Sequence, residues 1–519
     1  MGELSALFAA LLRQFFLGTH DMAKAGIDLL LHDGTSMKVF VEFGAMLADE
    51  AALHSAYQCR GASGLKPCAL CSNIFNWKVP RDVVLHDPSG TARYHTCFDV
   101  DAIKLHTTGT LRAVAQRLAA ASAVMTAANL EELQTRLGFN YVPKGVLQDA
   151  ELRALCNPVS HLLFDTMHVY YVNGIFNNHV GRLIESVKPY GLTYQQLHDY
   201  ASCWTWPARV KGNTGTDAFA GKRAESSWKA GVFKCTASEA LCLMPVISRF
   251  VEAVVLTSSL AAGRHAACFL LLAKVLELLE QTPRGGVTPQ ELQRAIVAHL
   301  NAYKMLYGEE WMPIKFHLSM HFPTFLGRWG ILPNCFVLER KHKRPKVFAN
   351  EIQNTSFNWE RSTLREVTVN HFADLERKGH FQAAACLVDP YTPRATTMLK
   401  IRDEMGIGAD FVVMTARKAR INEFEIVSNG DVVLVQPAEA ANNRFAGQVK
   451  YFVALEDPAG ESEVFVQIER WTLIAEGSRC SKWRRSVNDL VFISAAEIVC
   501  SVIWARSGNT ASVLKCIKL

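Results

Sequence analysis

The feature that most constrains the fold is a change of hydrophobic period along the chain. Residues 108–155 and most of 236–307 have helical composition, with a PRGG break near residue 283. From about residue 396, short apolar runs alternate with polar residues, as in GDVVLVQP, FAGQVKYFVALED and SEVFVQIERWTLI. A period near two is typical of β-strands, whereas helices bury residues three to four apart. The sequence therefore predicts a large helical region followed by a separate, small β-barrel domain of SH3-like size.

The N-terminal part has the pattern of a mixed α/β core. In GIDLLLHDGTSMKVFVEFGAMLAD, two apolar runs flank Asp33-Gly34, a turn pair that favours a β-hairpin. The second run ends at Asp49, and EAALHSAY then has helical composition. We expect a strand that places the Asp49 carboxylate at its C-terminal end, followed by a helix.

Composition leaves several functional classes open. The 519 residues, 49% of them apolar, allow two to four domains, and a net charge of +6 is compatible with a nucleic-acid partner without requiring one. The 14 cysteines are scattered, which indicates reduced thiols in an intracellular compartment. Charged residues interrupt both long apolar stretches, so we expect core helices and no membrane partner. These residues are Glu3, Arg13, Arg249, Glu252, Arg264 and Lys274.

A CxxC motif is the first candidate site. Cys68 and Cys71 form the motif, Cys59 precedes it, and His95 and Cys97 follow. Two thiolates at this spacing can bind one Zn²⁺, and a further His or Cys pair would complete a tetrahedral site. The pattern leaves open a structural zinc site or free thiols. It disfavours a redox motif, since no thioredoxin-like βαβ unit surrounds it.

Two histidine patterns follow. Asp165 and His168 lie three residues apart, on one face of a helix that starts near Asp165, but Asp is also a common helix N-cap. The pattern leaves open a helix start, a core histidine and a functional pair. His317 and His321 lie four apart without the Glu of HExxH, so we interpret them as core or supporting histidines.

Basic clusters form the last group of candidates. The apolar run 335–338 predicts a strand ending on Glu339, followed by basic residues. A solvated charged face is one interpretation, and a metal-binding carboxylate beside a polyanion surface is the other. Trp483 lies among a second cluster and could stack on a base. The candidate nucleic-acid-binding residues are Arg340, Lys341, Lys343, Arg344, Lys346, Lys482, Trp483, Arg484 and Arg485, with a loop containing Arg209, Lys211, Lys222 and Arg223.

Taken together, the order strand-Asp-helix, CxxC, DxxH, helical insertion and final Glu resembles the transposases of the CACTA (En/Spm-like) superfamily. The similar segments are DTMHVYYVNGIFNNHVG, MPIKFHLSMHFPTFLGRWGILPNCFVLERKHK and GDVVLVQP…GQVKYFVAL. The resemblance covers most of the chain and implies an α/β fold with an RNase H-like core. It divides the chain into a partial core with the CxxC motif (1–107), a helical insertion with the DxxH motif (108–310), the end of the core (311–395) and the β-barrel domain (396–519).

The resemblance also implies DDE-type chemistry. In that family, three carboxylates bind two divalent ions, Mg²⁺ or Mn²⁺, that cleave DNA and transfer its strands. Asp49 matches the second acidic position and Glu339 the third, while Asp165 and His168 match the DxxH signature in a supporting role. The implied partners are transposon ends and target DNA in the nucleus, bound by a homo-oligomer.

The family's first catalytic Asp has no match here, because Asp21, Asp28 and Asp33 all lie in unsuitable positions. We therefore expect the chain to begin inside the catalytic domain and cleavage to be impaired. Two alternatives stay open: a DNA- or chromatin-binding protein without catalysis, and a non-functional product of a decayed transposon.

Overall fold

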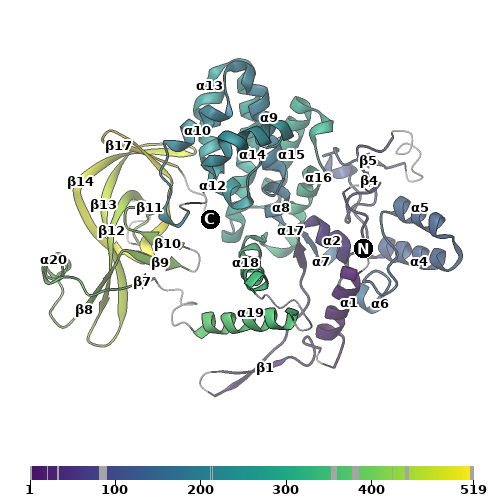
Figure 1. Ribbon diagram of the computed structural model, residues 1–519, viewed down its shortest axis with the longest axis horizontal. Coiled ribbons are helices and arrows are strands. Elements are labelled where there is room, and N and C mark those ends of the chain that lie inside the picture. The colour runs from purple at the N-terminus through teal and green to yellow at the C-terminus, as the bar shows by residue number, and fades with distance from the viewer. Residues whose placement is uncertain are drawn as a thin grey trace. The chain divides into compact units, whose positions relative to one another are not determined.

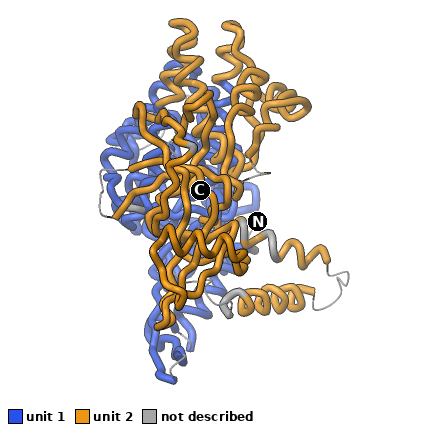
Figure 2. Tube along the Cα trace, turned by 90° about the vertical axis from the view of Figure 1, so that its left-hand side faces the viewer, with its two compact units in different colours: residues 1–182, 271–336 blue, residues 183–270, 337–519 orange. Residues whose placement is uncertain are grey.

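The protein is mixed α/β, and its residues gather in two compact units (Figures 1 and 2). The computed structural model describes residues 3–514 except 20, 32–33, 63, 81–89, 211, 213, 352–358, 377–384, 423–424 and 439–443. The first unit comprises residues 1–182 and 271–336, and the second comprises 183–270 and 337–519. The boundaries fall inside three helices, α9 (Ile175–Val187), α14 (Leu260–Gln281) and α18 (Phe336–Glu351). Each unit is therefore discontinuous in sequence.

The first unit is mainly helical, with three small sheets among its described residues. Its helices are α1 (Glu3–Phe16), α2 (Glu50–Ala56), α4 (Thr108–Val124), α5 (Ala127–Leu137), α6 (Ala150–Leu155), α7 (Pro158–His161), α8 (Thr166–Tyr170), α15 (Pro289–Tyr307), α16 (Lys315–Leu318) and α17 (Phe322–Trp329). Its strands are β1 (Ile27–Leu30), β2 (Ser36–Val39), β3 (Met46–Ala48), β4 (Ile74–Phe75), β5 (Arg93–Tyr94) and β6 (Leu162–Phe164).

Two of these small sheets bear on the predictions. β1 pairs with β2 antiparallel, which confirms the predicted hairpin, although Asp33 lies outside the described residues. The predicted second run is divided, because β2 ends at Val39 and the strand before Asp49 belongs to another sheet. β3 pairs with β6 in parallel, with Ala48 opposite Phe164. Both strands end at an aspartate that caps the next helix: Asp49 before α2 and Asp165 before α8. The predicted strand-Asp-helix unit is therefore confirmed, and a second one lies beside it.

The second unit combines helices with the C-terminal sheet. Its helices are α10 (Tyr194–Ser202), α11 (Gly221–Ala230), α12 (Ala237–Phe250), α13 (Leu256–Ser258), α18 (Phe336–Glu351), α19 (Trp359–Glu376) and α20 (Ala395–Met405). The run Ala237–Ser258, which contains Pro245 and a π-helical turn (Val251–Val255), is long and apolar enough to cross a membrane. Its most apolar stretch is 61% buried within the protein, as in the core helix of a globular domain.

The C-terminal region forms an antiparallel sheet that does not close, so the predicted β-barrel is wrong. Pairing runs β15-β11-β12-β13-β14-β17-β16, with β8 also on β12, and the two end strands are not paired with each other among the described residues. The paired strands are β8 (Val412–Ala416), β11 (Val432–Val435), β12 (Phe445–Glu456), β13 (Ser462–Glu476), β14 (Cys480–Ser494), β15 (Ile498–Ser501), β16 (Trp504–Ser507) and β17 (Thr510–Leu514). A second sheet contains β7 (Cys386–Val388), β9 (Lys418–Asn422) and β10 (Glu425–Ser428).

The strand predicted over residues 335–338 is also wrong, because helix α18 begins at Phe336. The Asn334 side chain accepts a hydrogen bond from the Phe336 backbone N–H at 3.2 Å, and this interaction favours the helix start. Four apolar residues are too few to distinguish a strand from a buried helical turn. Glu339 consequently lies in the first turn of a helix instead of at a strand end.

Candidate metal centre and acidic cavity

The CxxC motif lies in a loop that a neighbouring segment holds in place. The Ser72 N–H donates to the Lys104 carbonyl at 2.8 Å, and the His106 N–H donates to the Leu70 carbonyl at 2.7 Å. The backbone of Cys71 forms an isolated antiparallel β-bridge with Leu105. Both thiols are buried, at 4% and 1% exposure for Cys68 and Cys71. The loop therefore presents two inward-facing sulfur atoms on a fixed backbone.

Two distant histidines complete this cluster. His317 lies in α16 and His321 ends the following 3₁₀ turn, so the helical run places both rings on one face. The Cys71 Sγ lies 3.4 Å from His317 Nε2 and 3.5 Å from His321 Nε2, and Cys68 Sγ lies 3.4 Å from His321 Nε2. All four donor atoms are within 4.8 Å of one another, and all four residues are buried. The group could hold one metal ion.

The spacing of the cluster suits a tetrahedral ion. With metal–sulfur bonds near 2.3 Å and metal–nitrogen bonds near 2.0 Å, neighbouring S and N ligands of zinc lie about 3.6 Å apart. Burial opposes ionisation of the Cys68 thiol, yet its hydrogen bond with Cys71 and the two imidazoles hold the pKa of Cys68 well below its usual value. Burial and the neighbouring Cys68 raise the pKa of Cys71, so a bound cation would have to displace the second thiol proton. Burial lowers the pKa of His317, which favours the neutral, metal-binding imidazole.

The remaining ligands predicted from sequence lie elsewhere, so that part of the predicted ligand set is corrected. Both nitrogens of the His95 ring contact backbone groups. Nε2 lies 2.9 Å from the Met312 carbonyl oxygen, and Nδ1 accepts a hydrogen bond from the Trp77 N–H at 3.1 Å. Cys59 is buried, its thiol donates to the Tyr57 carbonyl, and burial raises its pKa. Cys97 is half-buried outside the cluster. His317 and His321, and not His95, Cys59 or Cys97, are the residues that join Cys68 and Cys71 in the candidate metal site.

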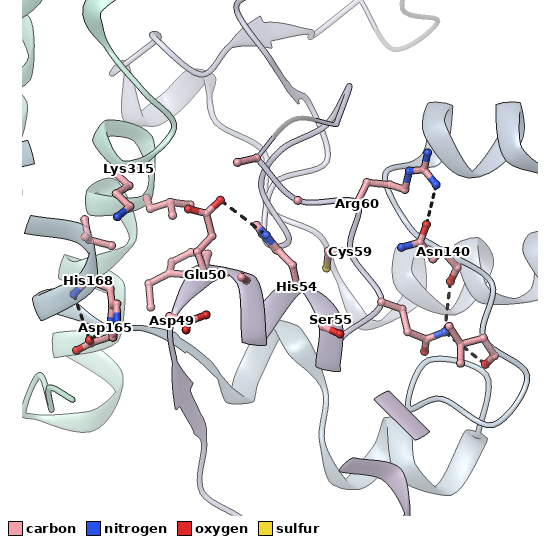
Figure 3. Close-up of a pocket in the computed structure, with 18 of the residues that line it drawn as sticks. Asp49, Glu50, His54, Ser55, Cys59, Arg60, Asn140, Asp165, His168 and Lys315 are labelled. Carbon is pink, nitrogen blue, oxygen red and sulfur yellow. Dashed lines mark hydrogen bonds and ion pairs between the residues drawn. The ribbon is translucent and has the colours of Figure 1, made fainter. Parts of the chain in front are cut away.

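A second feature of the first unit is a cavity of about 930 Å³ at the carboxyl ends of β3 and β6 (Figure 3). Asp49 and Asp165 both line it. One oxygen of Asp49 accepts from the Ala52 N–H at 2.7 Å as the N-cap of α2, and the other has no hydrogen bond among the described residues. Asp49 thus keeps a carboxylate oxygen free for a ligand.

Asp165 has no such freedom. Its buried carboxylate accepts from the N–H groups of Met167, His168 and Cys335, at 3.2, 3.1 and 2.9 Å, and also contacts His168 Nδ1. A carboxylate offers about four acceptor positions, and these contacts fill them. Asp165, His168 and Cys335 lie close enough together to hold an ion, but the existing hydrogen bonds favour a positioning role for Asp165.

Three further residues in the cavity were missed by sequence reasoning: Glu50, His54 and Lys315 (Figure 3). Burial raises the pKa of Glu50 to about 7, against an opposing effect of Lys315, and burial lowers the pKa of His54 to about 4. Glu50 Oε1 lies 3.7 Å from His54 Nδ1 and has no hydrogen-bond partner in the part of the chain that the structure describes. The only sequence signal was the i, i+4 spacing of Glu50 and His54 on the helix that Asp49 caps, and nothing in the sequence pointed to Lys315.

Glu339 belongs to the second unit, where its side chain is 47% exposed on α18 and lies 3.9 Å from His342 Nδ1. Lys341 and Lys346 are exposed on the same helix. The side chains of Arg340, Lys343 and Arg344 lie outside what the structure describes. Their backbone is helical, so the basic run extends along α18.

The basic cluster on β14 divides between two faces of its strand. Trp483 is 3% exposed, packs with Trp471 in the sheet core and donates its ring N–H to Ser481 Oγ at 2.7 Å, so its predicted stacking role is wrong. The Arg485 guanidinium lies over Trp471 and close to the Glu469 carboxylate. Lys482 and Arg484 alternate with them and are exposed.

The basic residues of the candidate loop, 209–223, also differ in their surroundings. Arg209 is half-buried against Ser501 and Glu425, and Arg223 pairs with both oxygens of Glu239. Lys222 is exposed, and Lys211 lies outside the described residues.

No protein-family model matches the sequence, and no curated protein or solved structure matches it. The fold and the site therefore define the class of protein by themselves. It is a mixed α/β protein with a helical region, a C-terminal antiparallel sheet and a buried Cys/His group that could hold a metal.

Proposed function

We propose that this chain is a transposase-derived protein, built on an RNase H-like core, whose ancestral activity is metal-dependent cleavage and transfer of DNA strands. One observation carries the proposal: Asp49 and Asp165 directly follow two adjacent parallel strands and line the same cavity. The carboxyl ends of parallel strands are a common place for ligand-binding side chains. The motif order that resembles the CACTA-like transposases supports the same conclusion.

In this proposal, Asp49 and Glu50 supply oxygen ligands to Mg²⁺. The second oxygen of Asp49 and Glu50 Oε1 accept no hydrogen bond from the described residues, and both fit the preference of Mg²⁺ for carboxylates. When bound, the ion would stabilise the charge that develops on a cleaved phosphodiester. Lys315 extends into the cavity near Glu50 and His168 (Figure 3), where its ammonium would contact a DNA phosphate.

We further propose that Cys68, Cys71, His317 and His321 bind a structural zinc ion. Four protein ligands leave no open position, and closed sites of this composition are structural. The ion would tie the CxxC loop to the helical run that carries Lys315.

The second candidate is a DNA- or chromatin-binding protein without catalysis. It is favoured by the saturated carboxylate of Asp165, because only Asp49 and Glu50 then offer oxygens in the described cavity. Two carboxylates from adjacent residues are fewer than DDE chemistry uses.

A plasmid-nicking assay with Mg²⁺ or Mn²⁺ separates the two candidates. If the chain is a nuclease, Asp49→Asn should lower nicking by at least about 100-fold, because even changes around a metal ligand cost 10–100-fold. Asn remains a good N-cap, so thermal stability should change little. Asp101→Asn, at an exposed position, is the matched control. A folded wild-type protein that binds DNA but never nicks it would instead establish the binding protein.

A further inference from the structure

The second unit contains a groove lined almost entirely by polar side chains. Helix α11 places Lys222, Ser226 and Lys229 at positions i, i+4 and i+7 of one face, and Lys234 lies across from them. Together with Glu225 and Ala230 these residues line a volume of about 510 Å³, here called the lysine groove.

The groove is built by packing rather than by loose surface side chains. The Phe233 ring, which is fully buried, stacks on Phe219 with centroids 5.0 Å apart and an angle of 11°. The Lys234 N–H donates to Ser227 Oγ at 3.0 Å, and Ser227 is itself buried. The Lys234 ammonium then donates to Ser226 Oγ at 3.0 Å. The segment after α11 is therefore anchored, and it holds a third ammonium group at the groove.

The charges of the groove lack internal neutralisation. Within the described chain, none of Lys222, Lys229 and Lys234 forms an ion pair with a carboxylate, and Glu225 is the single acidic residue of the lining. The neighbouring Arg223, by contrast, is bound to both oxygens of Glu239. The positive charge of the groove is thus available to an external anion.

Outside the groove lining, helix α11 carries an exposed aromatic side chain that contacts a fourth cation. Trp228, also on α11, is 42% exposed, and the Lys188 ammonium lies 4.1 Å from its ring centroid. An exposed indole on a lysine-rich helix is a combination that nucleic-acid-binding surfaces use, because the ring can lie against a sugar or base.

We infer that the lysine groove binds the sugar-phosphate backbone of a nucleic acid. Lys222 and Lys229 lie about 10 Å apart along the helix axis, so they would contact different phosphates of one strand. Isolated ammonium groups suit a repeated phosphate backbone, whereas recognition of one phosphoryl group favours the forked guanidinium of Arg. A lipid surface fits less well, because the lining contains no large apolar residue that could insert.

This inference does not depend on catalysis at Asp49. The groove lies in the second unit and shares no residue with the acidic cavity. Asp49→Asn should leave binding through the groove intact, and loss of the groove charges should leave the metal ligands intact. Failure of either proposal can therefore be recognised separately.

The test is the salt dependence of binding to a fluorescent random-sequence DNA duplex, measured by anisotropy between about 50 and 200 mM salt. Replacing Lys222, Lys229 and Lys234 by Glu should reduce the slope of log affinity against log salt by about 2–3, since each phosphate contact contributes about 0.9. Affinity at the lower salt should fall at least about tenfold. The control carries the same charge change at exposed lysines elsewhere, Lys104, Lys144 and Lys274.

A groove variant that keeps the slope and affinity of the control variant would overturn the inference. So would a variant that loses binding to anionic vesicles while its DNA binding is unchanged. If the Glu variant fails to fold, as judged by thermal unfolding, the Gln triple variant gives the same comparison with a smaller expected change in slope.

Discussion

The Glu50 carboxyl and the His54 imidazole are two buried groups whose protonation equilibria are shifted in opposite ways. Their side chains are 16% and 6% exposed, and both line the acidic cavity. Burial disfavours the charged form of each, so the folded protein prefers a neutral Glu50 and a neutral His54. The two preferences affect stability over nearly the same pH range.

The two groups make stability depend on pH with opposite signs. For Glu50 the pKa rises from 4.5 to about 7 on folding, so the stability it contributes is lost as pH rises through that window. For His54 the pKa falls from 6.5 to about 4, so stability is lost as pH falls through that window. Each contribution amounts to about 3 kcal/mol, and between pH 5 and 6.5 they should offset each other.

We therefore predict opposite pH slopes for the two single variants. Relative to wild type, Glu50→Gln should gain stability as pH rises from about 5 to 6.5, and His54→Gln should lose it. Urea unfolding at several pH values measures both slopes. Glu132→Gln, at an exposed helix position, should show neither slope. Parallel pH profiles for both cavity variants would contradict the opposed shifts.

At the scale of single elements, strand β14 shows how a period of two decides the role of a residue. Ser481, Trp483 and Arg485 face the sheet core and its aromatic residues, while Lys482 and Arg484 face solvent. Residues that are neighbours in the basic cluster of the sequence therefore lie on opposite faces of the strand. Trp483 contributes to packing, and only the exposed lysine and arginine remain available for an anion.

Substitutions along β14 should separate these roles. We expect Trp483→Ala to destabilise the protein by about 3–5 kcal/mol, because a large buried ring is lost from the sheet core. Lys482→Ala and Arg484→Ala should change the free energy of unfolding by no more than about 0.5 kcal/mol. Guanidinium unfolding provides the comparison. Equal effects of all three substitutions would contradict the inward placement of Trp483.

Local patterns in the sequence predicted local elements well. The hairpin of β1 and β2, the strand before Asp49 and the helix start at Asp165 all follow from turn, period and capping preferences. The histidines that complete the metal site with Cys71 could not be predicted in this way. His317 lies 246 residues from Cys71, and only the tertiary fold brings the two together. Alternation along β14 was visible in the sequence and would have placed Trp483 inside. Whether the core is RNase H-like stays a prediction.

For the whole molecule, the four residues of the Cys/His cluster all belong to the first unit. A structural zinc site contributes on the order of 10 kcal/mol, so its loss should unfold the segments that it joins. The C-terminal sheet contributes no ligand among the described residues. Metal removal should therefore affect the two units unequally.

We predict one zinc ion per purified chain by elemental analysis, and its loss in Cys71→Ser and His317→Ala. After chelation, hydrogen exchange should accelerate in the CxxC loop, α16 and α17, while β12, β13 and β14 stay protected. Cys97→Ser is the matched control, since it removes a thiol that lies near the motif in sequence but outside the cluster. Retention of zinc by His317→Ala, with its loss from Cys97→Ser, would overturn the ligand assignment.

The separation of the cysteines from the histidines has a consequence for synthesis on the ribosome. Cys71 and His321 are 250 residues apart, and ribosomes add about 5–20 residues each second. The cysteine loop therefore leaves the ribosome roughly 10–50 s before its histidines exist. During that interval the thiols have no native partners, and the whole of residues 183–270, part of the other unit, is made before the first unit can be completed. The nascent chain must keep its two thiols reduced and its first 182 residues soluble until the last segment of that unit arrives.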